Sequence, residues 1–178
     1  VLICNAASAT VGEVADCEVA EYERHLRSNV LSSVALTRAV MPGMIERGEG
    51  ALTFVLSALA VRSLPAFSTY AAAKAALRGF AESLRVELEG SPVRLLTVMP
   101  GTLRTEGLAR LDRVGREPRV LESGFALPPE RVAQRIVRAL ERDRGRVTVR
   151  GPAWLVQQLD HFAPSVVTRI LARLYRRG

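Results

Sequence analysis

Three short apolar runs, each followed by small or turn-forming residues, limit which folds are open to this chain. The runs are residues 1–4, 51–56 and 93–98. Continuous apolar runs of this length are typical of strands that are buried on both faces of a parallel sheet. The stretches that follow have helical patterns, at residues 18–47, 70–89 and 129–142, and a short strand pattern closes at 146–149. The alternation predicts an α/β fold with a doubly wound parallel sheet between two layers of helices.

The residues directly after the three runs carry the candidate site. Asn5-Ala6-Ala7 follows the first run, Ser57 the second and Pro100-Gly101-Thr102 the third. Ligands of open parallel sheets bind at the carboxyl ends of the strands. Because these ends share one edge, the pattern predicts that the three segments form a single site. Tyr70 begins the helix after the second run and can fold back over the same edge.

Tyr70 and Lys74 stand four residues apart in an alanine-rich helical segment, so they share one helical face. A nearby ammonium favours the phenolate, and we expect it to lower the pKa of the Tyr70 phenol from its usual value of about 10. Lys74 is also the only lysine among 25 basic side chains, the others being arginine. A compact ammonium at this position indicates an acid/base role for the pair. The alternative is a surface lysine, because Tyr-x-x-x-Lys spacing is common.

Composition excludes several other functions. The chain of 178 residues is long enough for one domain with a core, and none of its apolar runs reaches the length of a membrane span. Cys4 and Cys17 lack metal or redox spacing, so no metal site is expected. A serine hydrolase is disfavoured because Ser57 lacks a Gly-x-Ser-x-Gly elbow. His25 and His161 have no recognisable acid partner for such a triad.

The basic residues gather in the last part of the chain. Residues 1–103 have a net charge of −1, whereas residues 104–178 have a net charge of +8. Two helices are expected in the C-terminal extension, residues 151–178, and the second spans 164–177. Its apolar face is Val167, Ile170, Leu171 and Leu174, with arginines largely away from that face. It either packs on the domain or a partner subunit, or forms a peripheral membrane-surface helix. Nucleic-acid binding is not expected, because the arginines lack interleaved aromatic residues.

Taken together and in order, these motifs resemble those of the short-chain dehydrogenases/reductases, over nearly the whole chain. Asn5-Ala6-Ala7 is similar to the family's Asn-Asn-Ala-Gly turn, with Cys4 and Ala7 as departures. Asn29 matches the family's helix asparagine, and Ser57 precedes Tyr70 by the usual interval. Tyr70 and Lys74 match Tyr-x-x-x-Lys. The segment from Pro100 to Thr105 matches Pro-Gly-x-x-x-Thr.

The resemblance implies a Rossmann-type fold and NAD(P)-dependent interconversion of an alcohol and a carbonyl compound. It implies that Tyr70 is the acid/base, that Lys74 lowers its pKa and binds the nicotinamide ribose, and that Ser57 donates to the substrate oxygen. Asn29 would hold a water that links Lys74 to solvent. The remaining cofactor contacts implied by the family are Asn5, Ala6, Pro100, Gly101, Leu103 and Thr105. Residues 102–126 would form the substrate loop.

The chain departs from the family in lacking the glycine-rich turn that meets the pyrophosphate. We therefore expect an N-terminally incomplete single domain, with about 90 residues in three βα units upstream of Val1. On this view the fragment is inactive until the upstream half is supplied. NADP is favoured over NAD by analogy, and a cytoplasmic homo-oligomer is expected. A non-catalytic dinucleotide-binding or scaffolding module on the same fold remains the alternative.

Overall fold

The structure is a computed structural model that describes residues 1–104, 111–115, 126–149 and 152–176. Thr105 and most of the predicted substrate loop lie outside the described residues. No helix within the described ranges is long and apolar enough to cross a membrane.

A four-stranded parallel sheet forms the centre of the fold, in the order β1-β3-β4-β6. Its strands are β1 (Leu2–Cys4), β3 (Gly50–Val55), β4 (Val93–Met99) and β6 (Arg146–Thr148). In register, Leu2 lies beside Leu52, and Leu52 lies beside Leu95. Leu52 and Phe54 are fully buried, as expected for central strands that are covered on both faces. The predicted parallel sheet is confirmed.

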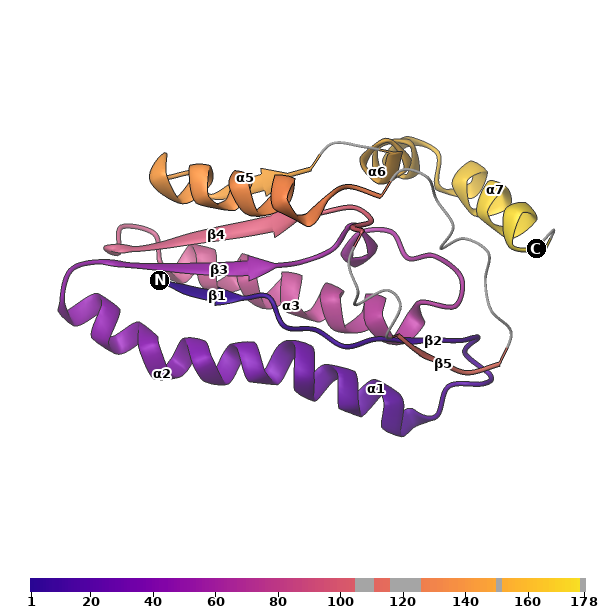
Figure 1. Cartoon of the computed structure of the whole chain (residues 1–178), viewed down its shortest axis with the longest axis horizontal. Helices are drawn as coiled ribbons and strands as arrows, with labels where there is room; N and C mark the ends of the chain where they lie inside the picture. The colour runs from indigo at the N-terminus through magenta and orange to yellow at the C-terminus, as the bar shows by residue number, and fades with distance from the viewer. Residues whose placement is uncertain (105–110, 116–125, 150–151, 177–178) are drawn as a thin grey trace.

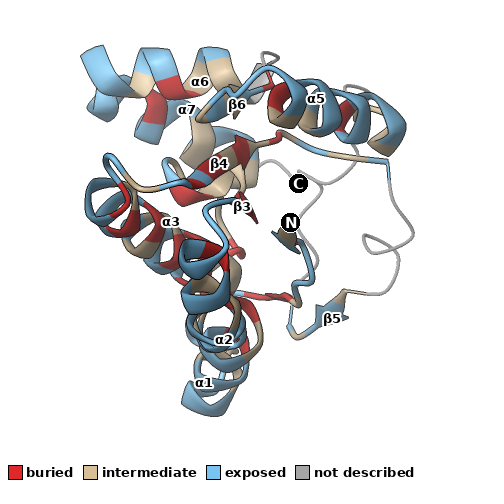
Figure 2. Ribbon diagram, turned by 90° about the vertical axis from the view of Figure 1, so that its left-hand side faces the viewer, coloured by how far each residue is buried: buried red, intermediate tan, exposed pale blue. Residues whose placement is uncertain are grey.

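Helices cover both faces of the sheet, as Figures 1 and 2 show. The elements are α1 (Val19–Leu26), α2 (Ser32–Glu46), α3 (Ser68–Glu87) and α5 (Pro129–Glu141). Successive β4 side chains point to opposite faces, so Leu95 packs in the core on the α2–α3 side. Leu96 packs with Val132 and Ala139 of α5 on the other side. Two cores separated by one sheet confirm the predicted three-layer architecture.

The predicted helix over residues 18–47 is interrupted by a π-helical turn, η1 (Arg27–Leu31), which joins α1 to α2. Asn29 lies in this turn and is almost completely buried. Such turns are rare and occur often at functional sites. The apolar periodicity of the sequence predicted one continuous helix, because an extra residue in one turn leaves no compositional mark.

A second, two-stranded parallel sheet pairs β2 (Thr10–Val11) with β5 (Asp112–Arg113). Val114 N–H donates to the Val11 carbonyl at 2.9 Å. The approach requires glycine at position 12, because a Cβ there would lie 2.4 Å from Val114 Cγ2. This pairing, which was not predicted, places the described piece of the 102–126 segment beside the chain that follows β1.

The C-terminal extension forms two helices, α6 (Pro152–Phe162) and α7 (Pro164–Arg176). They are attached near the carboxyl end of β3, where the 3₁₀ turn η2 (Ala58–Ala60) follows the strand. Gln157 Nε2 donates to the Ala58 carbonyl at 2.8 Å. Arg62 donates to Thr168 Oγ1 at 2.8 Å and forms an ion pair with Asp160 at 3.2 Å. The extension therefore packs on the domain.

Candidate active site

Three connecting segments meet at the carboxyl edge of the main sheet. Asn5 and Ala6 follow β1 and are exposed, and Ser57 follows β3 and is half-buried. The segment after β4 is tied to the one after β3, because Ala58 N–H donates to the Pro100 carbonyl at 2.9 Å. Leu103 is held by a parallel bridge to Leu127. The predicted convergence of the segments at one edge follows from the parallel topology.

Tyr70 lies in the first turn of α3, and its phenol lies close enough to the Ser57 hydroxyl for that hydroxyl to affect its pKa. Ser57 Oγ also accepts the backbone N–H of Leu59 at 3.2 Å, which fixes the hydroxyl at the start of η2. Burial raises the pKa of the Tyr70 phenol above its ordinary value, and the neighbouring Ser57 hydroxyl offsets part of this rise. The phenol is therefore protonated at neutral pH.

Lys74 follows one helical turn later and is only 2% exposed. Its Nζ donates to the Val55 carbonyl at 2.8 Å and lies 5.7 Å from the centre of the Tyr70 ring. Burial lowers the pKa of the ammonium to about 8, and the nearby Cys4 partly opposes this effect. The surface-lysine interpretation is excluded, since this side chain is in the core.

The expectation that Lys74 lowers the Tyr70 pKa is wrong for this structure, in which the pKa of the phenol is raised. The reason is desolvation, which disfavours the charged form of both groups. Burial acts against the phenolate of Tyr70 and against the ammonium of Lys74, so the two pKa values shift in opposite directions, that of Tyr70 upwards and that of Lys74 downwards. Helical spacing brings the pair together but does not report how deeply it is buried.

Asn29 holds the loop that follows β1. Its Oδ1 accepts the Ser8 N–H at 2.8 Å, and its Nδ2 donates to the Ser8 carbonyl at 2.9 Å. Ser28 Oγ donates to the same Oδ1 at 2.9 Å. The side-chain amide is therefore engaged with the loop backbone, and the role predicted for Asn29 towards Lys74 stays a prediction.

His25 is a fully buried residue next to this contact whose role the sequence did not indicate. Its Nδ1 lies 2.8 Å from Ser8 Oγ, and its Nε2 lies 2.9 Å from Thr10 Oγ1. Burial, with a smaller effect of Arg24, lowers the pKa of the imidazole. We call Ser8, Thr10, His25, Ser28 and Asn29 the loop clamp. The sequence held one sign of this cluster, because His25 and Asn29 stand four residues apart. Their hydrogen-bond partners lie 15 to 21 residues away in the chain, so the sequence alone does not reveal them.

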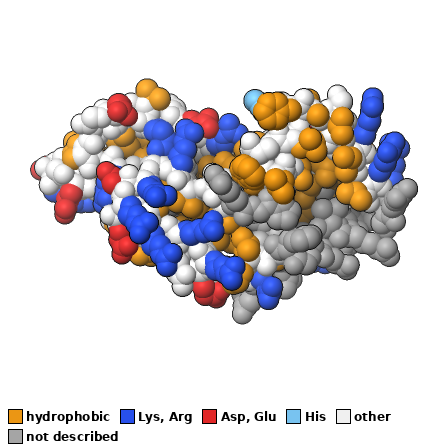
Figure 3. All heavy atoms as spheres, turned by 90° about the horizontal axis from the view of Figure 1, so that it is seen from above, with side chains coloured by type: hydrophobic (Ala, Val, Ile, Leu, Met, Phe, Trp, Pro, Cys, Tyr) orange, Lys and Arg blue, Asp and Glu red, His pale blue; other side chains and the backbone are white. Residues whose placement is uncertain are grey.

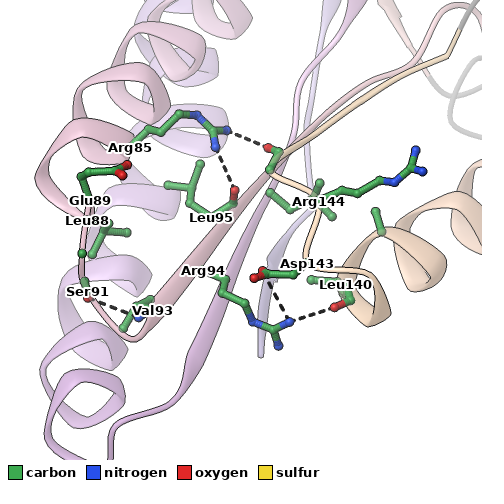
Figure 4. A pocket seen from close by; sticks show the side chains of 14 residues that line it. Arg85, Leu88, Glu89, Ser91, Val93, Arg94, Leu95, Leu140, Asp143 and Arg144 are labelled. Atoms are coloured by element: carbon green, nitrogen blue, oxygen red, sulfur yellow. Dashed lines mark hydrogen bonds and ion pairs between the residues drawn. The ribbon is translucent and has the colours of Figure 1, made fainter.

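A cavity of about 250 Å³ lies elsewhere, between the end of α3, the start of β4 and the turn after α5 (Figure 4). Two of the three arginines that line it donate to backbone: Arg85 donates to the Leu95 and Gly145 carbonyls, and Arg94 donates to the Leu140 carbonyl. Arg85 thus joins α3 to β4 and to the turn before β6, and Arg94 joins β4 to the end of α5. None of the predicted site residues that the structure describes lines this cavity. In the described part of the chain, no cluster of three His, Cys, Asp or Glu side chains could hold a metal ion.

Comparison with known proteins identifies the family. The family model described as short chain dehydrogenase matches residues 1–113. A "Dehydrogenase/reductase SDR family protein 7-like" of Drosophila melanogaster is 30% identical over 97% of this chain and 54% of its own length. The "Dehydrogenase/reductase SDR family member 7B" of Bos taurus is 32% identical over 99% of this chain and 56% of its own length. The chain thus spans little more than half of these curated relatives.

Solved structures agree in fold. A short-chain dehydrogenase from Streptomyces avermitilis is 26% identical, with a TM-score of 0.78 over 96% of this chain and 69% of that one. One from Burkholderia cenocepacia, crystallised with NADP, is 24% identical, with a TM-score of 0.79 over 95% of this chain and 67% of that one. With the parallel sheet and the family match, this likeness shows that the chain belongs to the short-chain dehydrogenases.

Proposed function

We propose that this chain carries the catalytic part of an NAD(P)-dependent oxidoreductase, which interconverts an alcohol and a carbonyl compound with Tyr70 as general acid/base. The proximity of the Tyr70 phenol to the Ser57 hydroxyl and to the buried Lys74, whose Nζ lies 5.7 Å from the centre of the Tyr70 ring, carries the proposal. Relatives named "Ketoacyl reductase HetN" and "3-ketodihydrosphingosine reductase" favour reduction of a ketone.

Each side chain has a role that follows from its protonation state. Tyr70, with its raised pKa, is a neutral phenol that can donate a proton to a carbonyl oxygen. The Ser57 hydroxyl gives that oxygen a second donor as negative charge develops on it. Lys74, with a pKa of about 8, is mostly protonated at neutral pH and would stabilise the phenolate that Tyr70 becomes. A bound nicotinamide cofactor would supply the hydride.

The residues at the carboxyl edge fit the nicotinamide half of such a cofactor. The Lys74 ammonium has three N–H groups, and among the described residues one hydrogen bond from it is found, to the Val55 carbonyl. A second N–H could therefore meet a ribose hydroxyl. Asn5, Ala6, Pro100, Gly101 and Leu103 would complete the contacts, while Thr105 lies outside the described residues. Structural neighbours were crystallised with NADP, NAD and NADH, and NADP stays favoured by analogy.

The test uses the protein with its upstream sequence, supplied with NADH or NADPH and a panel of ketones. Tyr70→Phe removes the proton donor and should lower turnover about 10²- to 10⁴-fold. The matched control is Tyr22→Phe, which removes a hydroxyl that lies 2.7 Å from Ser68 Oγ. Turnover should stay near the wild-type rate in this control. Equal turnover of wild type and Tyr70→Phe would overturn the role proposed for Tyr70, and no turnover by the wild type would favour the non-catalytic module instead.

The proposal extends to a cytoplasmic homo-oligomer formed through the helices that hold Asn29 and Tyr70. Apolar side chains exposed on these helices support it: Leu31, Leu36, Ile45 and Val86. Sedimentation velocity should give a mass above that of one chain. Leu36→Glu, at a half-exposed position, should shift the protein towards the monomer.

A further inference from the structure

The two C-terminal helices expose apolar side chains in a regular pattern. On α6 the exposed residues are Leu155, Leu159 and Phe162, the last being 80% exposed. On α7 they are Val166, Ile170 and Leu174, spaced four residues apart. Each set follows one helical stripe. Figure 3 shows hydrophobic side chains gathered over this end of the molecule.

This arrangement divides the apolar face that the sequence predicted for α7. Val167 is 3% exposed, and Leu171 is half-buried, whereas Ile170 and Leu174 face solvent. Packing of α7 on the domain therefore uses one apolar side and leaves a second one uncovered. Contact with the domain accounts for the buried side of α7 but not for the apolar side chains that face solvent, Ile170 and Leu174.

Arginines line the exposed stripe of α7 on one side. Three arginines of α7 are exposed, namely Arg169, Arg173 and Arg176. The first two each stand three residues after a residue of the stripe, and the third stands two residues after Leu174. The one acidic residue in α6 and α7 is Asp160, whose carboxylate is paired with Arg62. The surface thus combines a solvent-facing apolar stripe with positive charge that no acidic neighbour on these helices offsets.

We propose that α6 and α7 form a docking surface for the headgroup region of an anionic lipid bilayer. Apolar side chains from two adjoining helices would enter the boundary between headgroups and acyl chains, and the flanking arginines would meet anionic headgroups. Long arginine side chains can lay their methylene stems along apolar surface while the charged ends stay in the headgroups. The inference is independent of the proposed catalytic activity.

Charge favours a lipid surface over a second copy of this chain. In a twofold contact, the same patch would meet itself, which brings Arg169, Arg173 and Arg176 of one copy near those of the other. Like charges in such a contact oppose association. An anionic bilayer instead satisfies the apolar stripe and the arginines at once.

The experiment is co-sedimentation of the protein, including its upstream sequence, with vesicles of phosphatidylcholine alone or with phosphatidylserine. We expect binding to the anionic vesicles, weakened by high salt. Trp154, the only tryptophan of the chain, precedes Leu155 in α6. Its fluorescence should be quenched by brominated lipids. Failure of the wild type to bind anionic vesicles at low salt would overturn the proposal.

Two variants with matched controls separate the apolar and charged parts. Changing Leu155, Leu159 and Phe162 together to Ser should abolish binding, whereas Val19→Ser with Val137→Ser, exposed on other helices, should leave it unchanged. Changing the three α7 arginines to Gln should weaken binding about tenfold or more.

The control for the arginines removes the same charge from exposed positions of α5, namely Arg131, Arg135 and Arg138. Binding should fall much less in this variant. An equal fall in both arginine variants, or binding that survives the Ser variant, would mean general charge attraction and would overturn the docking surface. Circular dichroism of every variant should match that of the wild type, because all substituted side chains are exposed.

Discussion

Two sets of buried polar side chains lie on neighbouring helices near the same sheet edge. They differ in how many of their donors and acceptors have hydrogen-bond partners. The loop clamp around Asn29 engages both ends of the amide with the Ser8 backbone and both nitrogens of His25 with hydroxyls. Lys74, in the other group, has one hydrogen bond among the described residues, and its pKa is shifted far from the ordinary value. A saturated cluster fixes the chain in one arrangement, whereas an incompletely satisfied charge retains capacity for chemistry.

We expect the buried Lys74 ammonium to lower the stability of the fold. Lys74→Met should lower turnover about a hundredfold or more, because it removes the charge next to Tyr70. It should also stabilise the fold at neutral pH by about 2 kcal/mol, a figure that allows for the lost bond to Val55. Denaturant titration and steady-state kinetics measure the two effects. Arg78→Met, one turn later on α3 and partly exposed, should change neither by much.

The stability gain should depend on pH. The folded state releases the Lys74 proton near pH 8 and the unfolded chain near 10.5, so between these values the unfolded chain binds more protons. Stability of the wild type from this group therefore rises with pH across that window. The advantage of Lys74→Met should shrink as the pH approaches about 10. A constant advantage would show that the ammonium is not destabilised by burial.

Replacing Asn29 should lower the stability of the fold, in contrast to replacing Lys74, because the loop clamp holds the chain after β1 in place. Asn29→Ala leaves the Ser8 N–H and carbonyl without these partners and should destabilise the fold by about 2–3 kcal/mol, measured by urea unfolding. Asn5→Ala provides the control, since Asn5 is exposed at the same edge. A loss of turnover in Asn29→Ala with unchanged stability would place Asn29 with the catalytic group instead.

His25 should make the clamp sensitive to acid. The folded state resists protonation of this buried imidazole, whereas the unfolded chain takes up a proton near pH 6.5. Stability should therefore fall as the pH drops below that value, by at most about 1.4 kcal/mol per pH unit. His25→Gln, which keeps a donor and an acceptor, should reduce this dependence, while His161→Gln at an exposed position should not. Equal slopes in all three proteins would contradict the assignment.

The smallest effect is expected at the surface edge of the clamp. Arg24 pairs with Asp112 of β5 at 2.8 Å, and both side chains are about half exposed. Solvent screens such pairs, so Asp112→Asn should cost less than about 1 kcal/mol by thermal unfolding. A larger loss would mean that the β2–β5 pairing depends on this contact and not on its backbone hydrogen bonds.

The sequence determined the sheet, its two helical layers and the positions of Ser57, Tyr70 and Lys74, because apolar periodicity and fixed helical spacing are local properties. Only the tertiary structure revealed the π-helical turn, the β2–β5 pairing and the partners of His25, since these depend on contacts between residues far apart in the chain. It also decided the direction of the Tyr70 pKa shift, which depends on burial. Spacing says which groups can meet, and packing decides how much water remains around them.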